Sequence, residues 1–154
     1  MYGEKTKKIN LIMVSIEYSI VESVPPAEKF CELRKRAGLS PKSVEVAKRA
    51  LPHTVYGVSV VNNQDNSIVG MGRIVGDRYL ALTIVDVAVF PEHQKKGLGK
   101  LIMETLMTYI KANVTRDCYI TLMADGDAKF LYEKYGFITG LPISLGMYYS
   151  HPKQ

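Results

Sequence analysis

The sequence predicts an α/β fold in which a mixed, mostly antiparallel sheet is flanked by about four helices. Three observations predict it. Residues 55–89 contain three runs rich in β-branched side chains, separated by turn clusters, which is typical of an antiparallel meander. Residues 97–112 carry apolar side chains at the period of an amphipathic helix. The elements follow one another in the order β-α-α-β-β-β-α-β-α-β.

The first elements are a strand and two helices. Residues 14–21 alternate between apolar and polar side chains, which predicts a strand. A helix is expected over residues 27–37, after two prolines and before Gly38. A second helix is expected to begin with Ser40 as its N-cap and to end near Leu51.

The rest of the chain continues this alternation of strands and helices. Strands are expected at 55–61, 67–75, 79–89 and 119–124, helices at 97–112 and 128–135, and extended segments at 137–139 and 143–150. A length of 154 residues fits one domain, 1–154, with residues 1–13 as a peripheral N-terminal segment.

Composition excludes several classes of protein. The apolar runs fall short of a membrane span, and no secretory signal is recognisable at the N-terminus. Two cysteines are too few for a disulfide scaffold or a zinc cluster, so a reduced, cytoplasmic compartment and no metal are expected. Residues 28–49 hold seven basic and three acidic side chains, yet the chain has no Trp and no basic stripe with interleaved aromatics. A phosphate-bearing small ligand therefore explains this basic excess at least as well as nucleic acid does, and a solvated surface is the alternative interpretation.

One short segment suggests where such a ligand binds. Residues 94–100 place two glycines and three lysines between a buried strand and an amphipathic helix. A helix N-terminus offers unpaired N–H groups, and glycines allow close approach of a ligand, so the segment predicts a phosphate or pyrophosphate site. A P-loop does not fit, because Leu101 follows the lysine. A dinucleotide fingerprint does not fit either, because Ile102 stands where the third glycine belongs.

Two motifs resemble the GNAT superfamily of N-acetyltransferases. Residues 85–99, Val-Asp-Val-Ala-Val-Phe-Pro-Glu-His-Gln-Lys-Lys-Gly-Leu-Gly, are similar to its central motif, Gln/Arg-x-x-Gly-x-Gly/Ala. Residues 131–137, Leu-Tyr-Glu-Lys-Tyr-Gly-Phe, resemble its second motif, a helix ending in Tyr-x-x-x-Gly-Phe. The resemblance covers residues 14–150. It implies acetyl-CoA as the co-substrate and a GNAT-like sheet with a splayed central strand.

The resemblance also implies which residues hold acetyl-CoA. Its pyrophosphate is expected at the loop and helix start, and its pantetheine arm at the backbone of the splayed strand. These residues are Gln94, Lys95, Lys96, Gly97, Leu98, Gly99 and Lys100 for the pyrophosphate, and Val87, Ala88 and Val89 for the pantetheine. Asp125 stands where many members have an asparagine that contacts the cofactor, which puts that contact in doubt.

Two side chains and one backbone N–H are candidates for the chemistry. Tyr132 falls where many members keep a tyrosine near the sulfur of CoA, and its hydroxyl could protonate the leaving thiolate. The N–H of Val89 could polarise the thioester carbonyl. Asp86 is a carboxylate inside the core strand, and it could bind the substrate ammonium or anchor the strand bulge. Because Thr83 and Val85 stand where some members place Glu or His, a water-mediated base or a neutral substrate amine is expected.

The leading hypothesis is an N-acetyltransferase that acts by direct attack of the primary amine of a small molecule. Glucosamine phosphate is an alternative acceptor, as are peptide N-termini and protein lysines, and a CoA-binding sensor without turnover is the hypothesis from another class. A homodimer is considered, and no membrane partner is expected. His53 is interpreted as an exposed loop residue and Cys118 as a core residue. The side chains that could wall the acceptor site are Phe30, Arg34, Tyr56 and Arg73.

Overall fold

The computed structural model of this chain describes residues 11–13 and 17–151. The chain divides into two compact units, Met1–Leu122 and Met123–Gln154. The first unit contains β1 (Leu11–Met13), β2 (Tyr18–Val21), α1 (Ala27–Arg36), α2 (Val44–Ala50), β3 (Tyr56–Asn62), β4 (Ile68–Gly76), β5 (Ala81–Val89), α3 (Leu98–Asn113) and β6 (Tyr119–Leu122). The second contains α4 (Lys129–Glu133). Short 3₁₀ turns cover Leu51–His53, Pro91–His93 and Gly126–Ala128.

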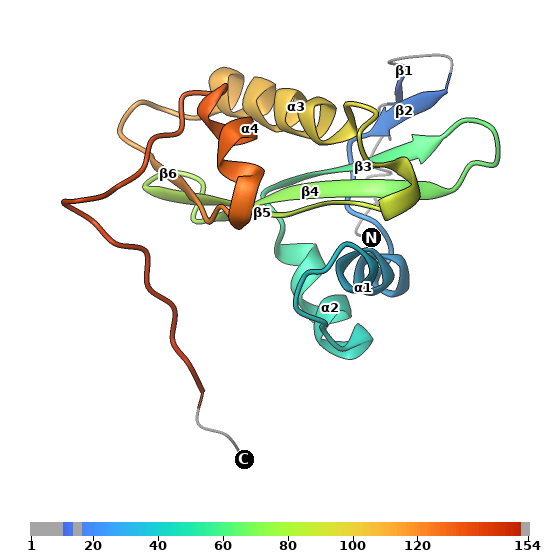
Figure 1. The fold of residues 1–154 in the computed structure, drawn as a ribbon, viewed down its shortest axis with the longest axis horizontal. Helices are drawn as coiled ribbons and strands as arrows, with labels where there is room; N and C mark the ends of the chain where they lie inside the picture. Colours follow the sequence, from blue (N-terminus) through green and yellow to red (C-terminus); the bar gives the residue numbers. More distant parts are fainter. Residues whose placement is uncertain (1–10, 14–16, 152–154) are drawn as a thin grey trace, which may run out of the picture. The chain divides into compact units, whose positions relative to one another are not determined.

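The six strands form one mixed sheet in the order β1-β2-β3-β4-β5-β6. Neighbouring strands from β1 to β5 are antiparallel, and β6 runs parallel to β5. Within the first unit, α3 covers one face of the sheet, and α1 and α2 lie on the opposite face (Figure 1). The mixed, mostly antiparallel sheet and the four α-helices are therefore confirmed. Of the strand expected at 14–21, residues 18–21 form β2, and residues 14–16 lie outside the described residues.

Gly72 explains how closely α3 approaches the sheet. It lies in β4, and a Cβ atom added there would stand 2.5 Å from Cγ2 of Ile102 in α3. The buried face of α3 includes Ile102, Met103 and Leu106, each with none of its surface exposed. The helical period of these residues in the sequence therefore corresponds to the contact that fixes α3, and with it the segment at its N-terminus.

The second helix begins later than the sequence suggested. Ser43, not Ser40, is the N-cap of α2, and its Oγ accepts the N–H of Val46 at 3.2 Å. The carbonyl of Ser40 instead accepts Nε of Arg34 at 2.9 Å. This contact holds Ser40 in the loop after α1, so the prediction of Ser40 as the cap is wrong.

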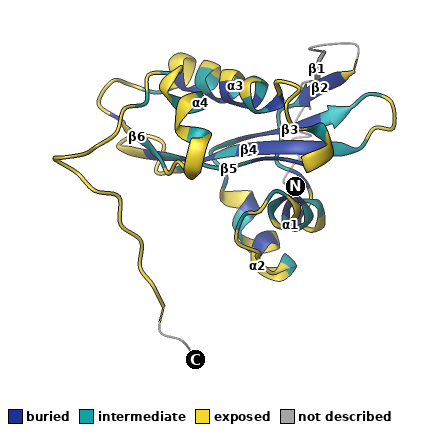
Figure 2. Cartoon of the chain, viewed as in Figure 1, coloured by how far each residue is buried: buried dark blue, intermediate teal, exposed yellow. Residues whose placement is uncertain are grey.

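The C-terminal part differs most from the prediction. Residues 137–139 and 143–150 were expected to be extended pieces of the sheet, but the structure assigns no strand to residues 123–151. The expected helix at 128–135 is shorter, because Gly126–Ala128 forms a 3₁₀ turn before α4. Most side chains after α4 are exposed (Figure 2). Alternation in the sequence predicts extended backbone, but a strand also requires a neighbour that supplies hydrogen bonds.

Candidate active site

A bulge interrupts the pairing of the two central strands. The register of β4 and β5 shifts between Met71 and Arg73, so Gly72 lies opposite both Asp86 and Val87. Asp86 has a φ of 57°, a left-handed conformation that Asp tolerates better than most residues. An extra residue in one strand bends it and increases its twist. The bulge therefore redirects β5 just before its C-terminal residues.

β5 also separates from β6, beginning just before the bulge. Their pairing ends where Ile84 lies opposite Leu122, whereas β5 continues to Val89. The N–H of Phe90 donates to the carbonyl of Val69 in β4 at 2.9 Å. Because successive residues of a strand point their backbone groups to opposite edges, the N–H of Val89 points away from β4. Within residues 11–13 and 17–151, no strand pairs with β5 along that edge after Ile84, so the expected splayed strand is confirmed.

Asp86 is held at the bulge by two arginines. Its side chain is only 5% exposed, and its Oδ1 and Oδ2 accept from Arg34 of α1 and Arg73 of β4, respectively. Arg73 also donates to Oγ1 of Thr54 at 3.3 Å. Both guanidinium groups lie over the ring of Phe30, at 5.9 Å and 5.5 Å from its centroid. These contacts connect β4, β5 and α1 at the point where β5 bends.

Of the four residues expected to wall an acceptor site, three meet in this cluster. Phe30, Arg34 and Arg73 surround Asp86, whereas Tyr56 stacks on Tyr109 with ring centroids 4.1 Å apart. The hydroxyl of Tyr56 donates to Glu22 at 2.7 Å. Burial and the nearby carboxylate of Glu22 raise the pKa of Tyr56 well above its ordinary value. Tyr56 therefore remains a neutral hydrogen-bond donor at physiological pH.

The segment before α3 has the geometry of an anion-binding turn. Lys95 and Gly97 both have left-handed backbone conformations, with φ of 59° and 78°. Gly97 is the N-cap of α3 and provides no side chain to accept the N–H groups of the first turn. Those N–H groups have no acceptor within the helix, and the helix dipole adds partial positive charge. Turns of this kind with converging N–H groups bind anions.

A side chain connects this turn to the splayed strand. Nε2 of Gln94 donates to the carbonyl of Val89 at 3.0 Å. The structure therefore brings together the open edge of β5 and the turn before α3. A recess of about 210 Å³ lies at the helix start. It is lined by Tyr18, Lys96, Gly97, Leu98, Lys100, Leu101 and Glu104.

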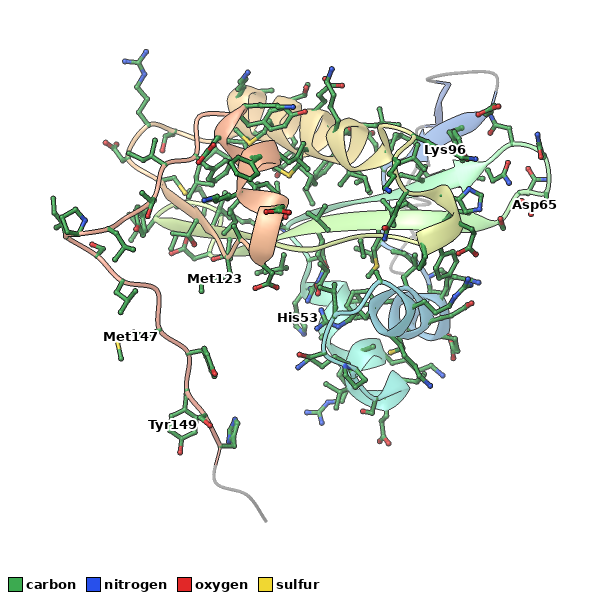
Figure 3. All side chains as sticks on the ribbon, in the orientation of Figure 1. His53, Asp65, Lys96, Met123, Met147 and Tyr149 are labelled. Atoms are coloured by element: carbon green, nitrogen blue, oxygen red, sulfur yellow. The ribbon has the colours of Figure 1, made fainter. Side chains whose placement is uncertain are left out.

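The recess contains a hydrogen-bonded network that sequence analysis missed. Nζ of Lys96, a side chain labelled in Figure 3, lies 3.2 Å from the hydroxyl of Tyr18. That hydroxyl lies 2.9 Å from Nδ1 of His93. The rings of Tyr18 and His93 meet edge to face. Because the Lys96 ammonium can only donate, the Tyr18 oxygen accepts from it. The alternating pattern around Tyr18 indicated burial, but nothing in the sequence connected it with residues 75 or more positions away.

The second unit holds Tyr132 and Asp125. Tyr132 lies in α4, is half-buried, and contacts Phe137 edge to face with centroids 6.5 Å apart. Burial raises the pKa of Tyr132, and the negative charge of Asp125 raises it further. Its hydroxyl is therefore protonated at neutral pH, as a proton donor must be. The side chain of Asp125 is exposed.

Other expectations concern residues outside this site. His53 is exposed at the end of a 3₁₀ turn, and Cys118 is buried. Cys31 and Cys118 are both free thiols. Among the described residues, no group of three or more His, Cys, Asp or Glu side chains could hold a metal ion. No helix in that part of the chain is long and apolar enough to cross a membrane.

Comparison with known proteins identifies the family. The family model of an acetyltransferase (GNAT) domain matches residues 55–139, more than half of the chain. This chain belongs to the GNAT family of N-acetyltransferases. An uncharacterized N-acetyltransferase of Porphyra purpurea, ycf52, is 31% identical to it over 141 residues, which are 90% of this chain and 70% of that protein.

Solved structures agree with this GNAT assignment. The Staphylococcus aureus protein SA2161, of unknown function, is 38% identical, with a TM-score of 0.81 over 87% of this chain and 99% of that chain. Glucosamine-6-phosphate N-acetyltransferase of Arabidopsis thaliana is 21% identical, with a TM-score of 0.62 over 86% of this chain and 99% of that one. At that identity the similarity shows a shared fold alone.

Proposed function

We propose that this GNAT protein transfers the acetyl group of acetyl-CoA to the primary amine of a small molecule. The observation that carries the proposal is the junction of β5 and α3. There, the edge of β5 is unpaired by any described strand after Ile84, and the N–H of Val89 points away from β4. Gln94 connects this edge to the N-terminus of α3, which has no side-chain cap, by donating to the carbonyl of Val89. This combination offers hydrogen bonds to an acyl chain and to an anion at adjacent positions.

The residues present fit acetyl-CoA chemically. Lys95 and Gly97 form left-handed turns just before α3, and no side chain caps the helix at Gly97. The N–H groups of its first turn are therefore available to a pyrophosphate. Lys96 and Lys100 line the adjacent recess and add positive charge. The edge of β5 from Val87 to Val89 is suited to the amide groups of the pantetheine arm. When bound, acetyl-CoA supplies the acetyl group as a thioester.

The proposed chemistry is a direct attack by the amine nitrogen on the acetyl carbon. The N–H of Val89 stabilises the oxyanion that develops on the carbonyl oxygen. As the carbon–sulfur bond breaks, the O–H of Tyr132 gives its proton to the thiolate. The proton released by the attacking amine passes to water, and water returns a proton to the Tyr132 oxygen before the next turnover. The raised pKa of Tyr132 keeps this donor protonated at neutral pH.

Asp86 is proposed to position the strand rather than to act as the base. Both of its carboxylate oxygens already accept from arginines, and its side chain is 5% exposed. Because the contacts lie at the bulge, their loss would disturb the strand that carries Val89. Water remains the proposed route for the amine proton. The cytoplasmic location remains a prediction.

A screen of acceptors tests the proposed function. Thiol release from acetyl-CoA is followed with alkyl and aromatic amines, amino acids, polyamines, glucosamine 6-phosphate and short peptides, and each product is weighed by mass spectrometry. We expect stoichiometric CoA release and N-acetylation with at least one small amine. Acetylation of peptides alone would refute the small-molecule proposal. CoA binding without turnover on any acceptor would support a sensor instead.

A further inference from the structure

The cluster around Asp86 carries more positive than negative charge. Arg34 and Arg73 share its single carboxylate, and the side chains of Arg34, Arg73 and Asp86 are only 12%, 17% and 5% exposed. Glu28 and Glu32, the acidic residues of α1, form ion pairs with other basic side chains. In the described part of the chain, neither arginine forms an ion pair with a second carboxylate. Charges that are largely removed from water are usually paired, so the excess positive charge predicts an anionic partner.

Both guanidinium groups also keep hydrogen-bond donors that no described residue accepts. Arg34 donates through Nη1 to Asp86 and through Nε to the carbonyl of Ser40. Arg73 donates through Nε to Asp86 and through Nη1 to Thr54. Within residues 11–13 and 17–151, every fully buried side-chain nitrogen or oxygen has a hydrogen-bond partner. The Nη2 groups of the two arginines have none there, so they reach solvent and can donate to an anion that arrives from solution.

The cluster lies near the backbone N–H that is proposed to hold the acetyl carbonyl. Asp86 precedes Val89 by three positions in β5, which is about 10 Å at the usual rise of a strand. A crevice opens beside Arg73 and Asp86 and is lined in part by Val24, Pro25 and Met71. α1, which supplies Arg34, lies on the face of the sheet opposite α3 (Figure 1). A molecule with an amine at one end and an acidic group several bonds away can therefore reach both places.

We propose that the acceptor of this N-acetyltransferase is a primary amine that also carries a carboxylate or a phosphate, and that Arg34 and Arg73 bind this acidic group. The inference rests on the proposed acetyl transfer and narrows its substrate class. Arginine presents paired N–H groups that match two oxygens of a carboxylate or a phosphate. Asp86 neutralises one guanidinium charge and holds both side chains at the bulge. The second positive charge remains for the acceptor, and an acceptor without an acidic group would leave it unpaired.

Matched acceptors test this proposal. γ-Aminobutyrate, 6-aminohexanoate and O-phosphoethanolamine are compared with γ-aminobutyramide, 6-aminohexanamide and ethanolamine, which keep the amine but lack the acidic group. We expect kcat/KM to be about tenfold or more higher for the acidic member of at least one pair, because hydrogen bonds to charged groups contribute a factor of this size. The carboxylate pairs and the phosphate pair distinguish the two sources of the charge. Calorimetric titration of the same pairs into CoA-loaded protein measures the preference without turnover.

Lysine variants test whether the two arginines cause the preference. Arg34→Lys and Arg73→Lys keep a positive charge beside Asp86 but lose the paired N–H groups. Each should lower the ratio of affinities for the acidic and the neutral member about fivefold or more. Because this ratio compares two acceptors on one protein, a general loss of stability does not change it. The control is Arg36→Lys on the same helix, where Arg36 pairs with Glu92 at the surface, and it should keep the ratio of the parent.

The titrations and the kinetics distinguish failure of this proposal from failure of acetyl transfer. Equal affinity for both members of every pair, with or without turnover, would overturn the anion site. A preference that persists unchanged in both lysine variants would overturn it as well. Tighter binding of the acidic member that depends on the two arginines, but without acetylation of any acceptor, would refute acetyl transfer and support the anion site alone.

Discussion

Replacing Asp86 with asparagine would remove one negative charge from between two arginines and change little else. Asparagine tolerates the left-handed conformation at this position as well as aspartate does, so the backbone of the bulge is not newly strained. The substitution leaves Arg34 and Arg73 facing each other without a shared anion. Breaking a buried ion pair costs about 3–5 kcal/mol. Because these arginines are 12% and 17% exposed, water compensates in part, and we expect about 3 kcal/mol.

Calorimetry measures this loss. For a chain of this size, about 3 kcal/mol lowers the Tm by roughly 6–12 °C. The control is Glu92→Gln, which removes the same charge from a surface ion pair with Arg36. The side chain of Arg36 is 42% exposed and that of Glu92 is 49% exposed. Breaking that pair should lower the free energy of unfolding by less than about 1 kcal/mol. A double-mutant cycle with Arg73→Gln should show that the two changes cost less together than their sum.

The kinetics of Asp86→Asn separate a positioning role from a base. If Asp86 were the general base, the variant would lose about 10²-fold or more in kcat while its Tm stayed near that of the parent. The positioning role predicts a lower Tm and a Km for acetyl-CoA that rises as the strand edge is disturbed. An unchanged Tm would refute the reasoning.

Three further variants test the anion-binding turn and the proton donor. Gly97→Ala should raise the Kd for CoA roughly 5- to 30-fold, because a left-handed conformation costs a Cβ-bearing residue about 1–2 kcal/mol. Gly38→Ala, at a φ of 83° outside the turn, should lose similar stability with an unchanged Kd for CoA, and a Kd for Gly97→Ala equal to that of the parent would exclude the turn as the CoA site. Lys96→Gln should weaken CoA binding and make the affinity depend less on salt, since exposed charges are screened within ~10 Å at 0.1 M. Titrations in which the affinity of the variant and of the parent fall equally steeply with salt would contradict this. Asp125→Asn should lower the pKa of Tyr132 by removing a negative charge, so kcat should begin to fall with rising pH at a lower pH than in the parent. An unchanged fall of kcat at alkaline pH would contradict the role of Tyr132 as the acid.

Local patterns in the sequence were sufficient to predict most helices and strands of the first unit. The periods of α1, the three strands of the meander and α3 locate these elements to within about two residues, because each buries one face against the sheet. The glycines before α3 also predicted the turn at which this helix begins, and anion binding there remains a prediction. The N-cap of α2 was harder to predict, since serine is a good cap and the sequence offers both Ser40 and Ser43. Only the contact between Arg34 and the Ser40 carbonyl selects the later one.

Long-range contacts account for what the sequence could not predict. Asp86 meets Arg34 across 52 positions and Arg73 across 13, and no spacing rule connects them. The link from Lys96 through Tyr18 to His93 has the same origin. The prediction of extended C-terminal segments was wrong for a related reason. Their alternation was recognised, but a strand also requires a hydrogen-bonded neighbour, and no local pattern specifies one.

The most direct test of the proposed acetyl transfer is the kcat of Tyr132→Phe with the best acceptor from the screen. Tyr79→Phe serves as control, because it removes the same hydroxyl from a side chain that is 72% exposed. General acid catalysis typically contributes about 10²–10⁴-fold, so we expect a loss of at least tenfold in kcat, with CoA affinity unchanged by calorimetric titration. Tyr79→Phe should have the same kcat and the same CoA affinity as the parent. A kcat for Tyr132→Phe within about twofold of the parent would contradict the account and assign the proton to water or another group.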